Sequence, residues 1–251
     1  MEEANARIRT DILGVRYDVV RFNETVDRLC TAHDALRGEY VCVGNVHTTV
    51  LAHDDAAFCA AENGAFRMLP DGRPISLVQK KRGYAHAEQV TGPDLMLAIL
   101  QRSADSGYTH YFYGSTADTQ AKLTERLSAQ FPGVRLLGGE PSLFRPLTDA
   151  ENDALIDRIN ALRPDFVWVG LGAPRQELFM HANRGRVNAL MLGVGGAFDV
   201  YAANVRRAPK WMQTLCLEWL YRLLQEPKRL FKRYLVTNSR FLYLLWKERP
   251  R

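Results

Sequence analysis

Residues 165–177 read DFVWVGLGAPRQE, where an apolar run passes through two glycines into a helical pattern. The run predicts a buried strand over residues 165–169 and a helix over residues 174–183. Glycines here let the backbone approach a ligand, and the amides that open a helix attract phosphate. Because position 175 is Arg, this is not the G-x-G-x-x-G dinucleotide fingerprint. Alone, the stretch is also typical of a tight turn, with Gln176 and Glu177 either binding a sugar or base or pointing into solvent.

The same strand–helix alternation continues on both sides of this stretch. The expected strands are residues 12–20, 40–43, 66–69, 108–113, 134–137, 165–169 and 189–194. The expected helices are residues 23–36, with Asn23 as N-cap, a helical stretch after Thr49, and residues 54–63, 93–106, 116–131, 148–162 and 174–183. This alternation predicts an α/β fold with a Rossmann-like, mostly parallel sheet and helices on both faces. Ligands of such sheets bind beyond the carboxyl ends of the strands.

Length and composition exclude several classes of protein. The chain has 251 residues, of which 47% are hydrophobic and 24% charged, which is typical of a globular enzyme rather than a disordered, collagen-like or disulfide-rich chain. The first residues are acidic and polar, so we expect no secretory signal. No apolar run approaches the roughly eighteen residues of a membrane-spanning helix. The four cysteines show no C-x-x-C spacing, which indicates reduced thiols in the cytoplasm.

Charge divides the chain into two parts. Residues 206–251 hold twelve Lys or Arg and three acids, a net charge of +9, which leaves −4 for residues 1–205. We therefore expect an α/β core over residues 1–205 and a basic helical appendage over residues 206–251, with helices at 208–225 and 228–247. The second helix carries an aromatic stripe flanked by cations. It could dock on the core, bind nucleic acid or lie on an anionic membrane, and the spacing favours a buried or interfacial face over a nucleic-acid arm.

Further candidate residues follow other predicted strands. Residues 193–199 read GVGGAFD, and two glycine loops on one sheet favour a shared phosphate or nucleotide cleft. Asp199 at the end of this loop could contact substrate, cap a helix or pair with a buried Arg. Residues 70–72 read PDG, usually a plain turn, although Asp71 could also take a proton from an acceptor hydroxyl. Asn45 ends a buried strand and could be a cap or a ligand contact.

No pattern in the sequence is typical of a metal ion or other cofactor. The six histidines lack metal-ligand spacing, and the chain has no D-x-D triplet, the nucleotide–metal clamp of many sugar transferases. G-x-S-x-G and Walker A motifs are also absent. We therefore expect neither metal nor cofactor.

Several short stretches together resemble one enzyme family. They are Asn45 and residues 70–72, 88–95, 170–177, 193–199, 207–209, 218–223 and 226–227, followed by Arg229. In their order and combination the chain resembles the WecG/TagA/CpsF glycosyltransferases from about residue 12 to residue 233. It differs from the family pattern at Val43, where Thr is frequent, and at Gln89, where Arg is frequent.

The resemblance implies an inverting glycosyltransferase that moves a sugar from a UDP-sugar to a polyprenyl-diphosphate-linked sugar in cell-surface or exopolysaccharide biosynthesis. N-acetylmannosamine, its uronic acid and glucose all remain open as the donor sugar. Asp71 resembles the family's catalytic base, and Asn45 and Gln176 its polar site residues. Arg222 and Arg229 resemble the arginines that reach the acceptor diphosphate. The other expected substrate contacts are Gly172, Glu177, Gly195, Gly196, Asp199 and Arg207.

The family also implies a cytoplasmic, peripheral protein on the inner face of the cell membrane. We expect an anionic membrane surface as a partner and no nucleic acid, and homo-oligomerisation stays open. Two alternatives remain at this point. A nucleotide-dependent oxidoreductase would suit the sheet but lacks the full dinucleotide fingerprint. A non-catalytic membrane- or nucleic-acid-binding adaptor would explain the tail but gives no role to the glycine loops and Asp71.

Overall fold

The computed structural model describes residues 7–248 and confirms the α/β fold. Its main sheet has six parallel strands in the order β4-β3-β8-β7-β5-β6. Their bounds are β3 (Tyr40–Gly44), β4 (Arg67–Pro70), β5 (Thr109–Gly114), β6 (Arg135–Glu140), β7 (Phe166–Gly170) and β8 (Leu190–Gly193). All of these strands therefore end at the same edge of the sheet.

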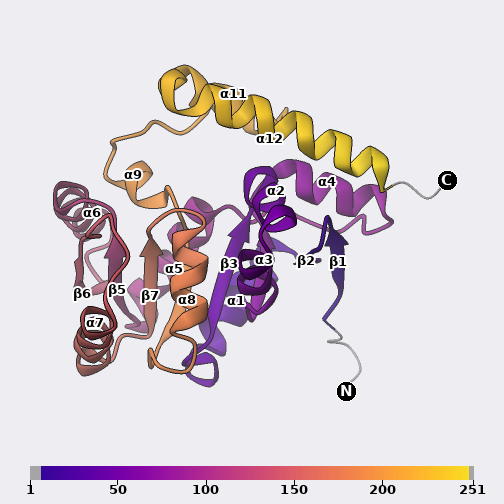
Figure 1. Ribbon diagram of the computed structural model, residues 1–251. Helices are drawn as coiled ribbons and strands as arrows, with labels where there is room; N and C mark the ends of the chain where they lie inside the picture. Colours follow the sequence, from indigo (N-terminus) through magenta and orange to yellow (C-terminus); the bar gives the residue numbers. More distant parts are fainter. Residues whose placement is uncertain (1–6, 249–251) are drawn as a thin grey trace.

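Helices cover both faces of the sheet, as the alternation predicts (Figure 1). Side chains of β3 alternate between two cores, with Tyr40 and Cys42 in one and Val41 and Val43 in the other. The first core is closed by α2 (Val46–Asp54), α3 (Ala56–Asn63), α7 (Asp149–Leu162) and α8 (Arg175–Ala182). The second is closed by α1 (Phe22–Thr31), α5 (Gly92–Ser106) and α6 (Ala117–Gln130).

The structure corrects several expected elements in the first part of the chain. The expected strand at 12–20 is a hairpin of β1 (Arg9–Ile12) and β2 (Val15–Asp18), because the chain turns at Leu13 and Gly14, both with positive φ. Helix α1 has Arg21, not Asn23, at its N-cap and ends at Thr31, before a short 3₁₀ turn (Asp34–Leu36). Two short helices were not predicted, α4 (Arg73–Lys81) and α9 (Ala197–Tyr201).

The basic tail is divided differently from the expectation. The helix expected over residues 208–225 is broken into α10 (Lys210–Thr214) and α11 (Glu218–Gln225), because Cys216 adopts a positive φ of 61° between them. Helix α12 (Pro227–Lys247) then runs as one long helix across α2, and Figure 1 shows it lying over the carboxyl-end edge of the sheet. No helix in residues 7–248 is long and apolar enough to cross a membrane.

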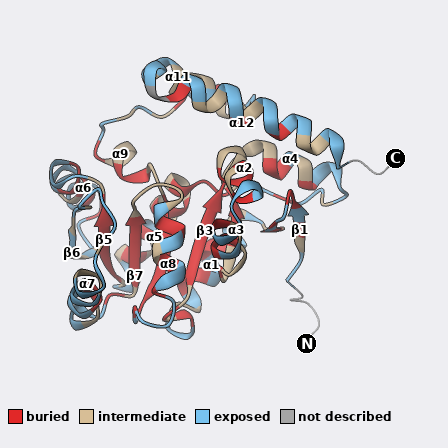
Figure 2. Ribbon diagram, in the orientation of Figure 1, coloured by how far each residue is buried: buried red, intermediate tan, exposed pale blue. Residues whose placement is uncertain are grey.

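Helix α12 presents two apolar stripes, where the sequence indicated one. Leu230 and Phe241 are buried, and Arg240 pairs with Asp54 at the end of α2. A second set lies one position further along the chain and is exposed: Phe231, Leu235, Leu242 and Trp246 (Figure 2). One residue is a rotation of about 100° on a helix, so the two stripes face different directions.

Candidate active site

The loops after β3, β4, β7 and β8 surround a cavity of about 800 Å³, which α10, α11 and α12 border on the other side. The predicted residues that line it are Asn45, Asp71, Gly172, Gln176, Gly195, Gly196, Asp199, Arg207 and Arg222, while Glu177, which is 0% exposed, stands behind this lining. The side chain of Arg229, the remaining predicted contact, lies outside the described part of the structure. The topology therefore brings together residues that are up to 177 positions apart.

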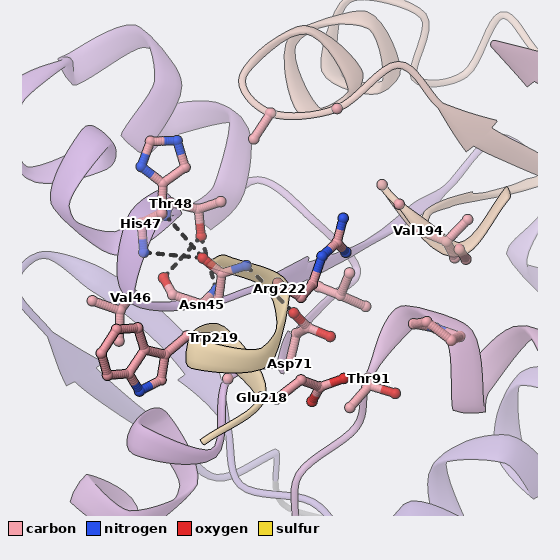
Figure 3. A pocket seen from close by; sticks show the side chains of 18 of the residues that line it. Asn45, Val46, His47, Thr48, Asp71, Thr91, Val194, Glu218, Trp219 and Arg222 are labelled. Atoms are coloured by element: carbon pink, nitrogen blue, oxygen red, sulfur yellow. Dashed lines mark hydrogen bonds between the residues drawn. The ribbon is translucent and has the colours of Figure 1, made fainter. Parts of the chain in front are cut away.

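Asn45 has two roles at the end of β3. Its side-chain oxygen accepts hydrogen bonds from the amides of His47 and Thr48 and so caps α2, with Thr48 completing a capping box. Its Nδ2 points the other way and donates to Oδ2 of Asp71 at 3.4 Å, as Figure 3 shows. The cap fixes the side chain, and the fixed side chain can hold Asp71.

Asp71 follows β4 and is held by neutral donors only. Its Oδ1 accepts the Gly92 amide at 3.0 Å, and its backbone carbonyl accepts Nε2 of Gln89 at 2.6 Å. Burial raises the pKa of this carboxyl above its usual range, and the hydrogen bonds from Gly92 and Asn45 oppose that shift. Gln89, where the family pattern often has Arg, thus positions the Asp71 backbone in this chain.

A cation close to Asp71 is already engaged elsewhere. Arg207 forms a two-armed ion pair with Asp94, and it also bonds the hydroxyl of Thr91. The pairing raises the pKa of Arg207 and helps to lower that of Asp94, against the effect of burial. Arg207 lowers the pKa of Asp71 as well, but burial outweighs this effect and the pKa stays raised.

The two glycine loops meet through one side chain. Oε1 of Gln176 accepts the Gly195 amide at 3.0 Å, and Nε2 of Gln176 donates to Glu177 at 2.8 Å. Gly172 and Gly195 both have positive φ, and a side chain on Gly172 would meet nothing within 4 Å. The sequence placed Glu177 in contact with substrate or solvent, whereas the structure buries it completely behind Gln176. Asp199 borders the cavity and holds Asn204 through its carboxylate.

The tail supplies cations and aromatic side chains to the cavity. A Cβ on Gly196 would come within 3.2 Å of a guanidinium nitrogen of Arg222, so this Arg lies against the second glycine loop. Arg233 also lines the cavity, a residue that the sequence analysis missed. Burial and the nearby Arg233 lower the pKa of His47 to about 4, so this histidine is neutral at physiological pH. Trp219 of α11 lies beside the Asn45 loop (Figure 3).

Among residues 7–248, one group of His and Asp side chains is close enough together to bind a metal ion, and it lies away from the cavity. His33, Asp34 and Asp165 stand together before β7, at the amino ends of the strands. Arg37 bonds both of these carboxylates, which accounts for the cluster as an ion-pair network.

Two comparisons relate this chain to known proteins. The model of the glycosyl transferase WecG/TagA/CpsF family matches residues 10–251. The N-acetylglucosaminyldiphosphoundecaprenol N-acetyl-beta-D-mannosaminyltransferase of Bacillus spizizenii strain W23 is 32% identical over 197 residues, which cover 78% of this chain and 75% of that protein.

The cap on α2 gives a test of the site's framework. Asn45→Ala should lower the free energy of unfolding by about 1 kcal/mol, because it removes the acceptor for two helix amides. Asn45→Ser keeps a capping oxygen and should lose less. Urea unfolding of both variants measures this, with Thr148→Ala, the N-cap of α7, as a control of similar size. Equal losses in Asn45→Ala and Asn45→Ser would contradict the capping role.

Proposed function

This chain belongs to the WecG/TagA/CpsF family and is a glycosyltransferase, and from that premise we propose that it transfers N-acetylmannosamine from UDP to a polyprenyl-diphosphate-linked N-acetylglucosamine. The acceptor and the transferred sugar follow from the name of the Bacillus relative, which favours N-acetylmannosamine over the uronic acid and glucose. The observation that carries the proposal is the Asp71 carboxylate, held in a cavity large enough for both substrates.

In the proposed reaction Asp71 is the general base. The acceptor hydroxyl attacks the anomeric carbon of the donor from the face opposite UDP, and the bond from that carbon to the diphosphate oxygen breaks. The hydroxyl proton passes to Asp71, the glycosidic bond forms with inversion, and UDP leaves with the bonding electron pair. A base in this position contributes a factor of roughly 10²–10⁴ to the rate.

Charge that develops on the leaving UDP would be met by chain residues. The Gly196 amide stands in the loop before α9, with Arg222 against it and Arg233 at the same cavity, whereas the Gly195 amide donates to Gln176. Backbone amides and arginines preorganised in this way stabilise developing phosphate charge. Gly172, Asp199 and Arg207 remain proposed substrate contacts because they line the cavity. Arg229 remains one because of the family resemblance alone.

We further propose that residues 206–251 bring the enzyme to the inner face of the membrane. The exposed stripe of α12 is joined by Trp211 and Leu215 of the α10 segment, both more than half exposed. Lys228, Lys232 and Lys247 flank the stripe. Aromatic and aliphatic side chains bordered by cations suit an anionic lipid interface. The lipid-linked acceptor would then reach the cavity from the side that α12 borders.

The reaction is proposed to need no divalent metal. We predict that purified protein releases UDP from UDP-N-acetylmannosamine, with a short-chain prenyl-diphosphate N-acetylglucosamine as acceptor, at the same rate with and without EDTA. The same assay with the uronic acid and glucose donors should give slower release. Loss of activity in EDTA that Mg²⁺ or Mn²⁺ restores would show a metal requirement. No release from any of the three donors would reject the proposed donor class.

Asp71→Asn should lower kcat by at least about 10²-fold, because it removes the base and keeps the size of the side chain. Wild-type kcat should fall as the pH drops through the pKa of Asp71, which burial places above the usual Asp range, and the variant should lose this limb. Asp105→Asn, exposed near the end of α5, is the control. A variant with the wild-type melting temperature and near-normal kcat would remove Asp71 from the base role.

The exposed stripe can be tested apart from the fold. Replacing Phe231, Leu235 and Trp246 together with Ser should abolish most sedimentation with vesicles that contain phosphatidylglycerol, because these side chains are 59%, 59% and 67% exposed and do not line the cavity. Their exposure also means that the melting temperature should change little. Leu162→Ser on α7, an exposed position on the core, is the control. Unchanged vesicle binding would show that another surface meets the membrane.

A further inference from the structure

Two carboxyl groups are buried together behind the cavity wall. Glu177 of α8 is 0% exposed and Glu62 of α3 is 1% exposed, and their helices pack against each other. Neither oxygen of Glu62 has a hydrogen-bond partner among the described residues, and Oε2 of Glu177 also has none. Two such groups in one core are costly, so their presence calls for a role.

No cation balances this pair in the described part of the chain. The groups that face it are Cys42 of β3, Tyr17 of β2 and the hydroxyl of Thr48 on α2. An ionised carboxylate in such surroundings is unfavourable, and two are more so. Burial raises the pKa of Glu177 to about 7, and burial together with repulsion from Glu177 raises the pKa of Glu62 well above its usual value. At neutral pH the pair therefore holds at least one proton.

A chain of hydrogen bonds connects the pair to the cavity. Oε1 of Glu177 accepts Nε2 of Gln176, and Oε1 of Gln176 accepts the amide of Gly195. The acceptor on Glu177 fixes which end of the Gln176 amide faces the glycine loop. Without it, no hydrogen bond from the described residues would distinguish the oxygen of Gln176 from its nitrogen, and a reversed amide would present a donor to the Gly195 N–H.

We propose that Glu62 and Glu177 form a protonated carboxyl pair, and that Glu177 is a positioning residue which orients Gln176 and, through it, the Gly195 loop. Glu177 acts from behind the wall rather than by touching substrate. Repulsion from Glu177 helps to keep Glu62 protonated, and burial does the same for both carboxyl groups. The activity readout below rests on the proposed function, whereas the stability readout does not.

The pair also makes stability depend on pH in a defined direction. The pKa of Glu177 is raised from 4.5 to about 7, so the folded state binds a proton that the unfolded state releases earlier. The stability gained from this proton is fully present below the pKa of Glu177 in the unfolded chain. It is lost as the pH rises through the pKa in the folded state. Glu177→Gln removes the titration but keeps an oxygen that can accept from Gln176. The melting temperature of wild type should therefore fall relative to that of Glu177→Gln between about pH 5 and pH 8.

The test compares Glu177→Gln, Glu177→Leu and Glu62→Gln with Glu125→Gln, an exposed carboxylate on α6. We expect Glu177→Gln to keep kcat within about threefold of wild type, and Glu177→Leu to lose about 10- to 100-fold through the misplaced loop. Glu62→Gln should reduce the loss of stability with rising pH, because it removes the second carboxyl, which burial and repulsion from Glu177 keep protonated. The control should match wild type in all measurements.

Three results would overturn the proposal. They are a Glu177→Gln enzyme that folds but loses activity like Glu177→Leu, a folded Glu177→Leu enzyme with normal kcat, and a Glu177→Gln melting profile with the same pH dependence as wild type. If Glu177→Leu does not fold, the activity of Glu177→Gln and the pH dependence of its melting temperature decide whether the proposal holds. If wild type transfers no sugar, the proposed function fails, and the melting profiles still test the carboxyl pair.

Discussion

Asp71 depends on two neutral hydrogen-bond donors, the Gly92 amide and the Asn45 side chain, which approach it from different segments. A guanidinium in the same place would hold the carboxylate more tightly but would lower its pKa and weaken it as a base. Arg207 instead pairs with Asp94, an arrangement that suits the proposed role of Asp71 as a base. The arrangement requires β3 and β4 to be neighbours in register, with Gly44 opposite Pro70, so that Asn45 and Asp71 leave the sheet side by side. Gly44 has no space for a side chain, because a Cβ would collide with Met68 and Tyr17.

Most of the sheet could be predicted because each buried strand is an apolar run next to turn residues, as β3 and β7 show. The short helix α4 could not, since the Asp-Gly before it is equally the sequence of a simple turn. The helix expected over residues 148–162 is present, and Thr148 and Glu151 at its start form a capping box, a pattern that is readable in the sequence. Arg21 caps α1 without any side-chain bond, so no residue type marked that helix start.

The site residues that directly follow a predicted strand could be placed from the sequence. Gln176 and Gly195 follow strands, and parallel topology alone brings them together. The burial of Glu177 was not predictable, because it depends on Glu62 and Cys42, more than a hundred positions earlier. Arg233 was missed for a similar reason. The rotation of α12 about its axis, set by packing on α2, decides that Arg233 lines the cavity and that the neighbouring Lys232 does not.

The two stripes of α12 restrict how this segment can change in evolution. Leu230 and Phe241 fasten the helix to the core at positions eleven residues apart, which is close to three full turns. Inserting or deleting a single residue between them would turn the following part of the helix by about 100°. Phe241 would then leave the core, and the side chains that border the cavity would exchange places with those that face outward. Single substitutions at exposed positions of α12 are therefore tolerated. Insertions or deletions between Leu230 and Phe241 are not.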